Sequence, residues 1–319
     1  MAFRLWHRGC FLHRGRSLHA PPVRSGPMRV LLATDGSSYA REAARFLNNL
    51  LHHEVAAQID VVAVRPTAMS GDGMIRPRAR GFHPVAAELP GCSTPEDWLL
   101  EARRELTNPG LTIESVELSG DPVRLVVERS VSIRYDLVVA GAKGCGATPF
   151  FELGTVARAL LQDSPASTLL VRKGGGGYAR EFSTPSGHRP ARALIASAGP
   201  AASPGSDPTP EWPLLASFAL DSGEIPVVPC LPGHGYQPRE VDREARRGEV
   251  DLLIIDGRGP DDATGISSSA ARTTVWTAPC STLLLRDGRR RTPTSSPALR
   301  RASPPRATQR SRSVRELQS

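Results

Sequence analysis

The sequence predicts an α/β protein in which parallel strands alternate with helices. Short apolar runs rich in Val, Ile and Leu alternate with segments whose apolar residues recur every three or four positions, the spacing of one helical face. Capping residues, or turns that contain glycine and proline, separate the two kinds of segment. Strands that alternate with helices form a parallel sheet covered on both faces.

The first unit is expected between residues 28 and 173. Its expected strands are 28–34, 59–64, 111–118, 135–141 and 167–173, of which 111–118 mixes polar and apolar residues as an edge strand does. Its expected helices are 40–51, 94–107, 121–131 and 154–163, which start near Ser37 or Ser38, Thr94, Asp121 and Gly154. Residues 66–94 are rich in Gly, Pro and Arg without periodicity, which is typical of a functional lid or of disorder.

Residues 191–287 resemble a degenerate copy of this unit. The segments ARALIASAG (191–199), DLLIIDGRG (251–259) and CSTLLLRD (280–287) parallel MRVLLATDG, DLVVAGAKG and ASTLLVRK of the first unit. Residues 224–232 can form its second strand and 238–247 a helix, but the sequence offers no clear third strand. Two units of similar internal spacing, joined by a Gly- and Ser-containing linker at 174–190, indicate a tandem protein. The fold class is therefore two Rossmann-like domains, the second a shortened copy.

The net charge of +8 comes from the two ends of the chain. Residues 1–27 carry five arginines and no acid, whereas 287–319 carry nine arginines and two acids, so the part between them has a net charge of −4. Both ends, 1–27 and 288–319, are expected to be disordered, and the first is either a basic extension or a mis-assigned start before Met28. Solvated tails are favoured over a nucleic-acid-binding arm, so no nucleic-acid partner is expected.

Three further classes of protein are disfavoured by what the sequence lacks. No apolar run approaches the roughly 18–20 residues that span a bilayer, so no membrane segment is expected. The five cysteines form no CxxC pair, which favours a reducing, cytoplasmic setting. The histidines and cysteines lack the spacing of a structural zinc site, so no metal site is predicted among them.

The expected ligand position follows from the sheet order. In a parallel sheet ordered 3-2-1-4-5, ligands bind at the carboxyl ends of the strands where the order reverses, between the first and fourth strands. The first strand ends in Thr34-Asp35 and the fourth in Ala140-Gly141. These two ends should therefore face each other across one crevice.

The stretch GAKGCGATPFFELGT (141–155) follows the fourth strand and lines this crevice. Its glycines either form a sharp turn or allow backbone amides to approach an anion. Gly154-Thr155 begins a helix, whose N-terminus offers free amides and a positive dipole end. Asp35 would repel phosphate but can accept hydrogen bonds from a ribose or a base. The combination predicts a nucleotide site.

The spacing Gly141-x2-Gly144-x9-Gly154-Thr155, with Asp35 closing the first strand, resembles the ATP-binding branch of the universal stress protein family. The surrounding DLVVAGAKG, LGTVARALL and STLLV resemble it too, and the resemblance covers about 28–173. It implies the adenine nucleotide alpha hydrolase-like form of the Rossmann fold. It also implies ATP as the ligand, with Mg²⁺ as an accompanying ion.

The resemblance further implies which residues contact the nucleotide. Asp35 would face the adenosine and Val64 would pack on the adenine, while glycine backbone and helix-start amides would hold ribose and phosphates. The implied contacts are Thr34, Asp35, Val64, Ala140, Gly141, Gly144, Gly154, Thr155 and Val156. A phosphate contact of Lys143 is left open, and Cys145 is interpreted as a small loop residue rather than a redox centre.

The second copy departs from this pattern at the positions that would hold phosphate. Ala198 replaces the aspartate, Ser268-Ser269 replace Gly154-Thr155, and Gly257-x-Gly259 precedes Asp261-Asp262, which would repel a polyphosphate. We expect no ATP in this half. In the family, last strands commonly pair across a dimer interface. Strands 167–173 and 280–286 are therefore expected to pair within one chain as a pseudo-dimer, and a further homodimer is left open.

The expected function is an ATP-binding, non-catalytic stress-response regulator. Nucleotide would order the 66–94 loop and so change a docking surface for an unidentified protein partner. Two alternatives stay open, a weak ATPase that uses the same site and a nucleotide-independent interaction module. No SGGxDS, HxGH, KMSKS or GxSxG motif indicates another enzyme class.

Overall fold

The structure is a computed structural model. It describes residues 26–66, 94–145, 153–173, 190–197, 214–221, 227–229, 238–247, 250–256 and 274–286. Several predictions fall outside these residues: both basic ends, most of the 66–94 loop and of the 174–190 linker, and the second copy's Ala198, Gly257 to Asp262 and Ser268-Ser269. Those predictions stay predictions.

The first unit alternates strands and helices in the expected sequence. Its elements are β1 (Met28–Thr34), α1 (Ser38–Leu50), β2 (Ala57–Arg65), α2 (Pro95–Glu105), β3 (Leu111–Ser119), α3 (Pro122–Ser132), β4 (Leu137–Gly141), α4 (Thr155–Asp163) and β5 (Ser167–Val171). The second unit contains β6 (Ala193–Ser197), the 3-10 turn η4 (Leu215–Ser217), β7 (Val227–Pro229), α5 (Pro238–Arg247), β8 (Leu252–Asp256) and β9 (Ser281–Leu285). One helical turn at 274–277 precedes β9.

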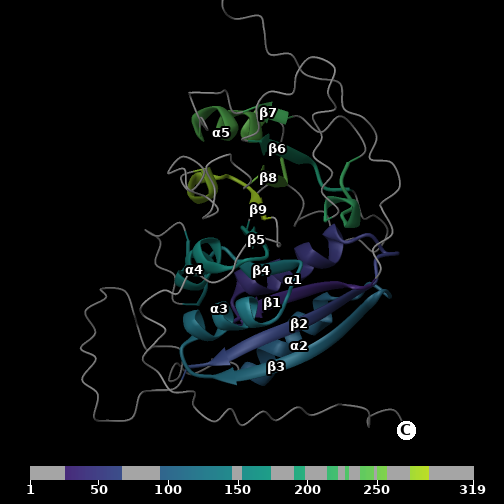
Figure 1. Cartoon of the computed structure of the whole chain (residues 1–319), viewed down its shortest axis with the longest axis vertical. Helices are drawn as coiled ribbons and strands as arrows, with labels where there is room; N and C mark the ends of the chain where they lie inside the picture. The colour runs from purple at the N-terminus through teal and green to yellow at the C-terminus, as the bar shows by residue number, and fades with distance from the viewer. Residues whose placement is uncertain are drawn as a thin grey trace, which may run out of the picture.

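All the strands belong to one sheet, ordered β3-β2-β1-β4-β5-β9-β8-β6-β7 (Figure 1). The first unit thus has the predicted 3-2-1-4-5 order. Every described pairing between neighbouring strands is parallel except β5 with β9, which is antiparallel. The predicted pairing of the last strands of the two units is therefore present.

The second unit repeats the order of the first without its third strand. β6 lies between β7 and β8, as β1 lies between β2 and β4, and β9 follows β8 as β5 follows β4. Within the described ranges, β7 is the last strand on this side of the sheet. The same position in the first unit is extended by β3.

The bounds of four strands of the first unit differ from the prediction, and β3 differs only in ending at Ser119 rather than 118. β2 is longer than 59–64 because β3 pairs with it over its whole length, from Ala57 to Arg65. β4 begins at Leu137 rather than 135, since Asp136 instead exchanges two hydrogen bonds with the backbone of Arg29 (2.8 and 2.9 Å). β5 ends at Val171 rather than 173, since the amide of Arg172 donates to the hydroxyl of Ser281 (3.3 Å).

Helices begin where side chains satisfy their first amides. Ser37 Oγ accepts from the amide of Ala40 (3.1 Å) at the start of α1. Thr94 and Asp97 form a reciprocal capping box at α2. Asp121, the predicted cap of α3, accepts from the amide of Arg124 (2.8 Å). These three predicted helix starts are confirmed.

Helices and short segments cover both faces of the sheet. On one face, α1 and α2 of the first unit pack over the strands beside residues 214–220 of the second unit. On the other face lie α3 and α4 of the first unit, followed by α5 and the 274–277 turn of the second. Sequence reasoning did not predict the 214–220 segment, in which Phe218 is buried and forms a β-bridge with Leu51 at the end of α1.

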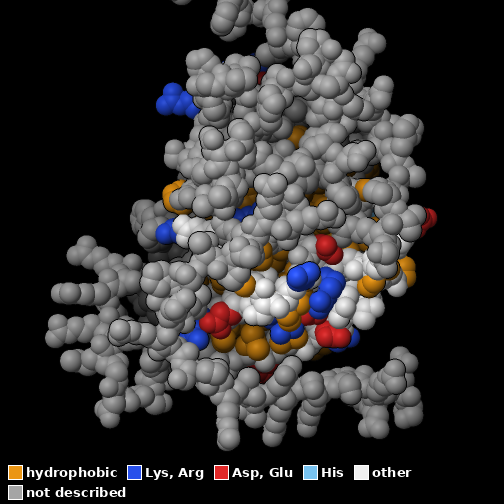
Figure 2. All heavy atoms as spheres, viewed as in Figure 1, with side chains coloured by type: hydrophobic (Ala, Val, Ile, Leu, Met, Phe, Trp, Pro, Cys, Tyr) orange, Lys and Arg blue, Asp and Glu red, His pale blue; other side chains and the backbone are white. Residues whose placement is uncertain are grey.

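Charged side chains of both signs lie on the surface of the first unit. In the view of Figure 2, Arg side chains lie beside acidic ones rather than in one basic patch on the part of this face that the described residues form. Arg45 with Glu105 (2.8 Å) and Arg65 with Glu117 (2.8 Å) are two ion pairs of this unit. Within the described ranges, no helix is both long and apolar enough to cross a membrane.

A buried polar network connects β2 with the segment between α3 and β4. Asp60 lies inside β2 with 3% of its surface exposed. Its Oδ2 atom accepts from the hydroxyl of Tyr135 (2.5 Å) and from the guanidinium of Arg129 (2.8 Å). Burial and the hydrogen bond to Asp60 raise the pKa of Tyr135 above its usual value, so the hydroxyl remains a donor.

We expect Tyr135→Phe to lower the free energy of unfolding by about 1–3 kcal/mol, because a buried carboxylate loses a neutral donor. Urea unfolding followed by circular dichroism measures the change. Arg124→Ala is the control, since it breaks only the exposed ion pair with Glu128 and should leave the midpoint unchanged. Equal midpoints for wild type and Tyr135→Phe would contradict this role of the network.

Candidate functional site

The candidate site comprises Asp35, the 141–145 loop and the start of α4 at 154–156. β1 and β4 are neighbours in the sheet, with Leu32 opposite Val139, so the residues that follow each strand meet at the same edge. The Oδ2 atom of Asp35 accepts from the amide of Cys145 (2.8 Å). The predicted approach of Asp35 to the glycine loop is therefore confirmed.

Asp35 holds its position through hydrogen bonds from two chain segments. Its Oδ1 atom accepts from the amide of Ser37 (3.0 Å), within the turn that leads into α1. Its Oδ2 atom is the one that accepts from Cys145, more than a hundred residues away. The carboxylate therefore connects the end of β1 to the loop after β4.

The turn that carries Asp35 is also constrained from the opposite side. Gly36 has a φ of 71°, which favours glycine, and a Cβ atom there would lie 2.2 Å from Cδ1 of Trp98. Trp98 belongs to α2 and is buried. Sequence reasoning did not identify Trp98 as a neighbour of the site, because only the folded chain brings α2 against this turn.

The first two glycines of the motif leave room for other parts of the protein. A Cβ atom on Gly141 would lie 2.8 Å from the backbone carbon of Tyr39, so glycine allows α1 to approach β4. A Cβ atom on Gly144 would lie 2.5 Å from Oδ2 of Asp35. Packing within the protein therefore accounts for glycine at both positions, a role that the sequence did not reveal.

Gly154 differs from these two glycines. Its φ is −69°, which any residue adopts, and a Cβ atom there would be no closer than 3.5 Å to its neighbours, which is ordinary contact. Within the described part of the chain, neither the backbone nor the packing requires glycine at this position. Its neighbours include the amide nitrogen of Gly144, so Gly144 and Gly154 do lie together as the motif predicts.

No side chain of the described residues caps the first amides of α4. Gly154 is the N-cap and accepts from the amide of Arg158 through its carbonyl (3.0 Å), while its own amide donates to Ala142 (2.8 Å). The amides of 155–157 precede that first helical bond and lie at the positive end of the helix dipole. Thr155 is exposed and Val156 is half-buried. This end of α4 is suited to an anion.

The remaining predicted contacts lie on strand ends at the same edge of the sheet. Val64 and Ala140 are buried, on the face that α3 and α4 cover. Thr34 is also buried, and its hydroxyl accepts from the amide of Gly36 (3.4 Å). These three residues therefore present little side-chain surface at the site.

Lys143 and Cys145 are both placed by the structure. Lys143 is half-buried in the loop, whereas Cys145 is exposed and its thiol donates to the carbonyl of Asp35 (3.1 Å). Gly146 and the rest of the loop up to 152 lie outside the described residues. The phosphate contact of Lys143 stays open.

Arg65 and two acids form an ion-pair group at the end of β2, near Val64. The guanidinium of Arg65 lies 2.8 Å from Glu117 and 3.0 Å from Glu96, and the hydrogen bond to Glu117 raises its pKa. Its charge is therefore balanced by carboxylates. Among the described residues, no group of three or more His, Cys, Asp or Glu could hold a metal ion.

Residues 27–172 match the model of the universal stress protein family. The comparison with curated proteins finds no match. Among solved structures, a functionally unknown protein from Pseudomonas aeruginosa PAO1 is similar over 82% of this chain and 94% of its own, with 10% identity and a TM-score of 0.50. At this identity the similarity concerns the fold.

Two further solved structures are similar to parts of the chain. A universal stress protein from Archaeoglobus fulgidus DSM 4304 covers 81% of this chain and 98% of its own, with 14% identity and a TM-score of 0.46. A universal stress protein family protein from Arabidopsis thaliana, with AMP bound, covers 51% and 98%, with 16% identity and a TM-score of 0.32. Residues 27–172 therefore form a domain of the universal stress protein family.

Proposed function

We propose that the first unit binds ATP at the candidate site and that the protein acts as a non-catalytic stress-response regulator. The observation that carries the proposal is Gly154. Glycine stands there although neither its φ nor its packing against the described residues requires it, at the start of a helix whose first amides receive no side-chain cap from those residues. A bound polyphosphate would explain both facts, because any side chain beyond Cβ would obstruct its approach to those amides.

The charges at the site indicate the orientation in which the nucleotide would bind. Asp35 repels phosphate, whereas the N-terminus of α4 attracts it. The phosphates would therefore lie at Thr155 and Val156. The ribose would lie at Asp35, whose oxygen now held by the Cys145 amide can accept from a ribose hydroxyl. Val64 lies beyond Asp35 on the neighbouring strand, on the side where the adenine is expected.

A magnesium ion fits this arrangement only in part. Mg²⁺ prefers oxygen ligands and is commonly held by substrate phosphates with one or two protein groups. At the described part of the site, Thr155 supplies a side-chain oxygen beside the expected phosphates, whereas Asp35 lies beside the expected ribose. The ion would then neutralise phosphate charge, while Thr155 and the α4 amides orient the phosphates.

The absence of catalysis is part of the proposal. Asp35 is the one carboxylate in the described part of the candidate site, and both of its oxygens accept backbone hydrogen bonds. A carboxylate held in this way is poorly placed to activate a water molecule. Phosphate release from ATP that exceeds the background and is lost in Asp35→Ala would favour the weak ATPase instead.

We expect wild-type protein to bind one ATP per chain in isothermal titration calorimetry, and Gly154→Val to weaken binding at least about tenfold, because the branched side chain covers the helix-start amides. Gly26→Val is the matched control. A Cβ atom at Gly26 meets nothing within 4 Å, and the residue precedes β1 at the opposite edge of the sheet. Failure of wild type to bind ATP would refute the proposal.

The proposed orientation of the nucleotide predicts that substitutions at the two ends of the site affect the affinities for ATP and adenosine differently. Asp35→Ala should weaken both ligands by about fivefold or more, because the group that faces the nucleoside is lost. Gly154→Val should weaken ATP and leave adenosine unchanged, because adenosine has no phosphate. Competition titrations with the two ligands measure this. If Gly154→Val weakened adenosine as much as ATP, the phosphates would not lie at α4.

A second candidate function is a nucleotide-independent interaction module. The uncapped start of α4 next to Gly144 favours nucleotide binding over this alternative. We further propose that nucleotide occupies the first unit alone, because the second unit's sequence lacks the aspartate and the Gly-Thr pair. A measured stoichiometry of two ATP per chain would contradict this part of the proposal.

A further inference from the structure

Helix α4 contacts the second unit at its C-terminal end. The guanidinium of Arg286, the residue after β9, donates to the backbone carbonyls of Leu161 and Ser164. The last carbonyls of a helix have no partner within the helix, and a cation there interacts favourably with the helix dipole. Arg286 therefore supplies two of the hydrogen bonds that complete this end of α4.

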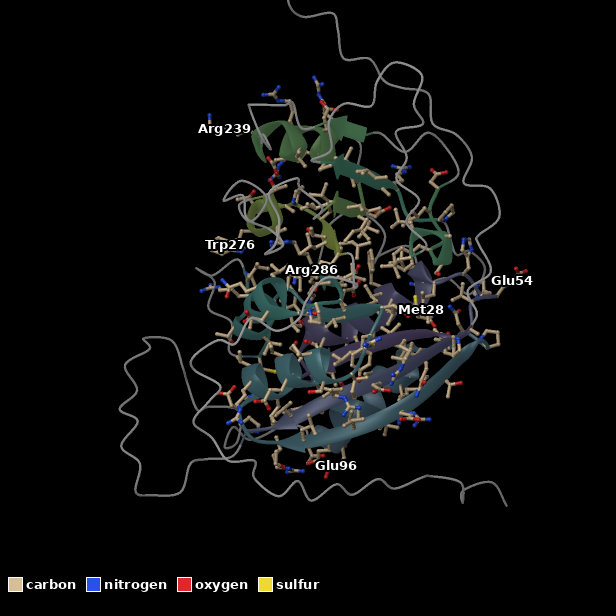
Figure 3. All side chains as sticks on the ribbon, in the orientation of Figure 1. Met28, Glu54, Glu96, Arg239, Trp276 and Arg286 are labelled. Atoms are coloured by element: carbon tan, nitrogen blue, oxygen red, sulfur yellow. The ribbon has the colours of Figure 1, made fainter. Side chains whose placement is uncertain are left out.

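A second contact lies nearer the start of the helix. The guanidinium of Arg158 lies over the ring of Trp276, with 5.6 Å between its central carbon and the ring centroid. Trp276 belongs to the helical turn of the second unit that precedes β9. Figure 3 shows Trp276 and Arg286 at the level where the second unit meets α4.

The contact of Arg286 with the first unit has a counterpart, in which an arginine of the first unit contacts the second. Arg172, the residue after β5, donates to the carbonyls of Val275 (2.9 Å) and Trp276 (2.6 Å) at the end of the 274–277 turn. The backbone amides of Arg172 and Arg286 each donate to the serine that begins the other unit's last strand, Ser281 (3.3 Å) and Ser167 (3.1 Å) respectively. The junction thus has an approximate twofold symmetry centred on the pair Leu169–Leu283.

This symmetry has different consequences for the two units. In the first unit, the helix that receives the arginine is α4, whose opposite end holds the amides of the candidate site. α4 has 9 residues, so its two ends are only about 13 Å apart. A helix of this length moves as a rigid body, so a shift at Leu161 and Ser164 also moves the amides of Thr155 and Val156.

We propose that Arg286 and Trp276 are positioning residues for the nucleotide site, so that the second unit sets the affinity of the first unit for phosphate. This inference rests on the proposed ATP binding and names how that site is supported. The fork of the Arg286 guanidinium suits this role, because it donates to two carbonyls at once. The second unit thereby contributes to nucleotide binding without a nucleotide of its own.

The test compares Arg286→Gln with Arg172→Gln in the full chain. Both substitutions remove one arginine from the same symmetric junction, but only the first removes a contact with α4. We expect Arg286→Gln to raise the Kd for ATP by about three- to tenfold and to leave the Kd for adenosine unchanged. Arg172 supports α4 only indirectly, through the turn that carries Trp276, so Arg172→Gln should raise the Kd for ATP less than Arg286→Gln does, although both variants lower the melting temperature.

A second variant keeps the test independent of folding defects. Trp276→Ala removes the partner of Arg158 without touching the β5–β9 pairing, and Trp276 is 39% exposed, so the fold should tolerate it. We expect a loss of ATP affinity smaller than that of Arg286→Gln, again without a change for adenosine. Arg286→Lys should restore part of the affinity, because the charge remains while one of the two carbonyls loses its donor.

The outcomes separate this inference from the proposed function. If wild type binds ATP and Arg286→Gln and Trp276→Ala bind it equally well, the positioning role is refuted and the site stands. Equal weakening by Arg172→Gln and Arg286→Gln, or equal weakening of ATP and adenosine, would also refute it, because a general loss of stability would then explain the data. No ATP binding by wild type would refute both proposals.

Discussion

The parallel pairing of β1 with β4 is the interaction on which the candidate site depends. β1 is flanked by β2 and β4, and each connection returns through a helix, so the carboxyl ends of these strands lie along one edge. That geometry places Asp35 beside the loop after β4, where its carboxylate accepts from the amide of Cys145. The start of α4 is brought to the same place by the hydrogen bond between Gly154 and Ala142.

The antiparallel pairing of β5 with β9 joins the two units into one sheet. Without it, each unit would expose its last strand as an unpaired edge. The pairing covers both edges and brings Arg172 and Arg286 to the ends of opposite helical segments. The contact between Phe218 and the end of α1 is a second connection between the two units, on the face of the sheet that α1 and α2 cover. The second unit is therefore a structural partner of the helix that begins at the candidate site.

Most of the fold of the first unit was predictable because its determinants are local. The starts of α1, α2 and α3 follow from capping side chains within three residues of the amides that they satisfy. The predicted positions of the strand ends were less accurate, because a strand ends where its pairing with the partner strand ends. β2 extends as far as β3 pairs with it, and β5 stops where Arg172 turns toward Ser281.

The sequence by itself determined the alternation of strands and helices and the spacing of Gly141, Gly144 and Gly154, whereas the expected 3-2-1-4-5 order rested on the resemblance to a known family. Periodicity, capping residues and motif spacing involve short stretches of chain, so they can be recognised from the sequence alone. Only the tertiary structure decided what each glycine does. Gly141 makes room for α1 and Gly144 for Asp35, whereas Gly154 has no neighbour among the described residues that requires glycine. The reciprocal arginines were likewise hidden in the sequence, because their partner carbonyls lie more than a hundred residues away and become neighbours only when β5 pairs with β9.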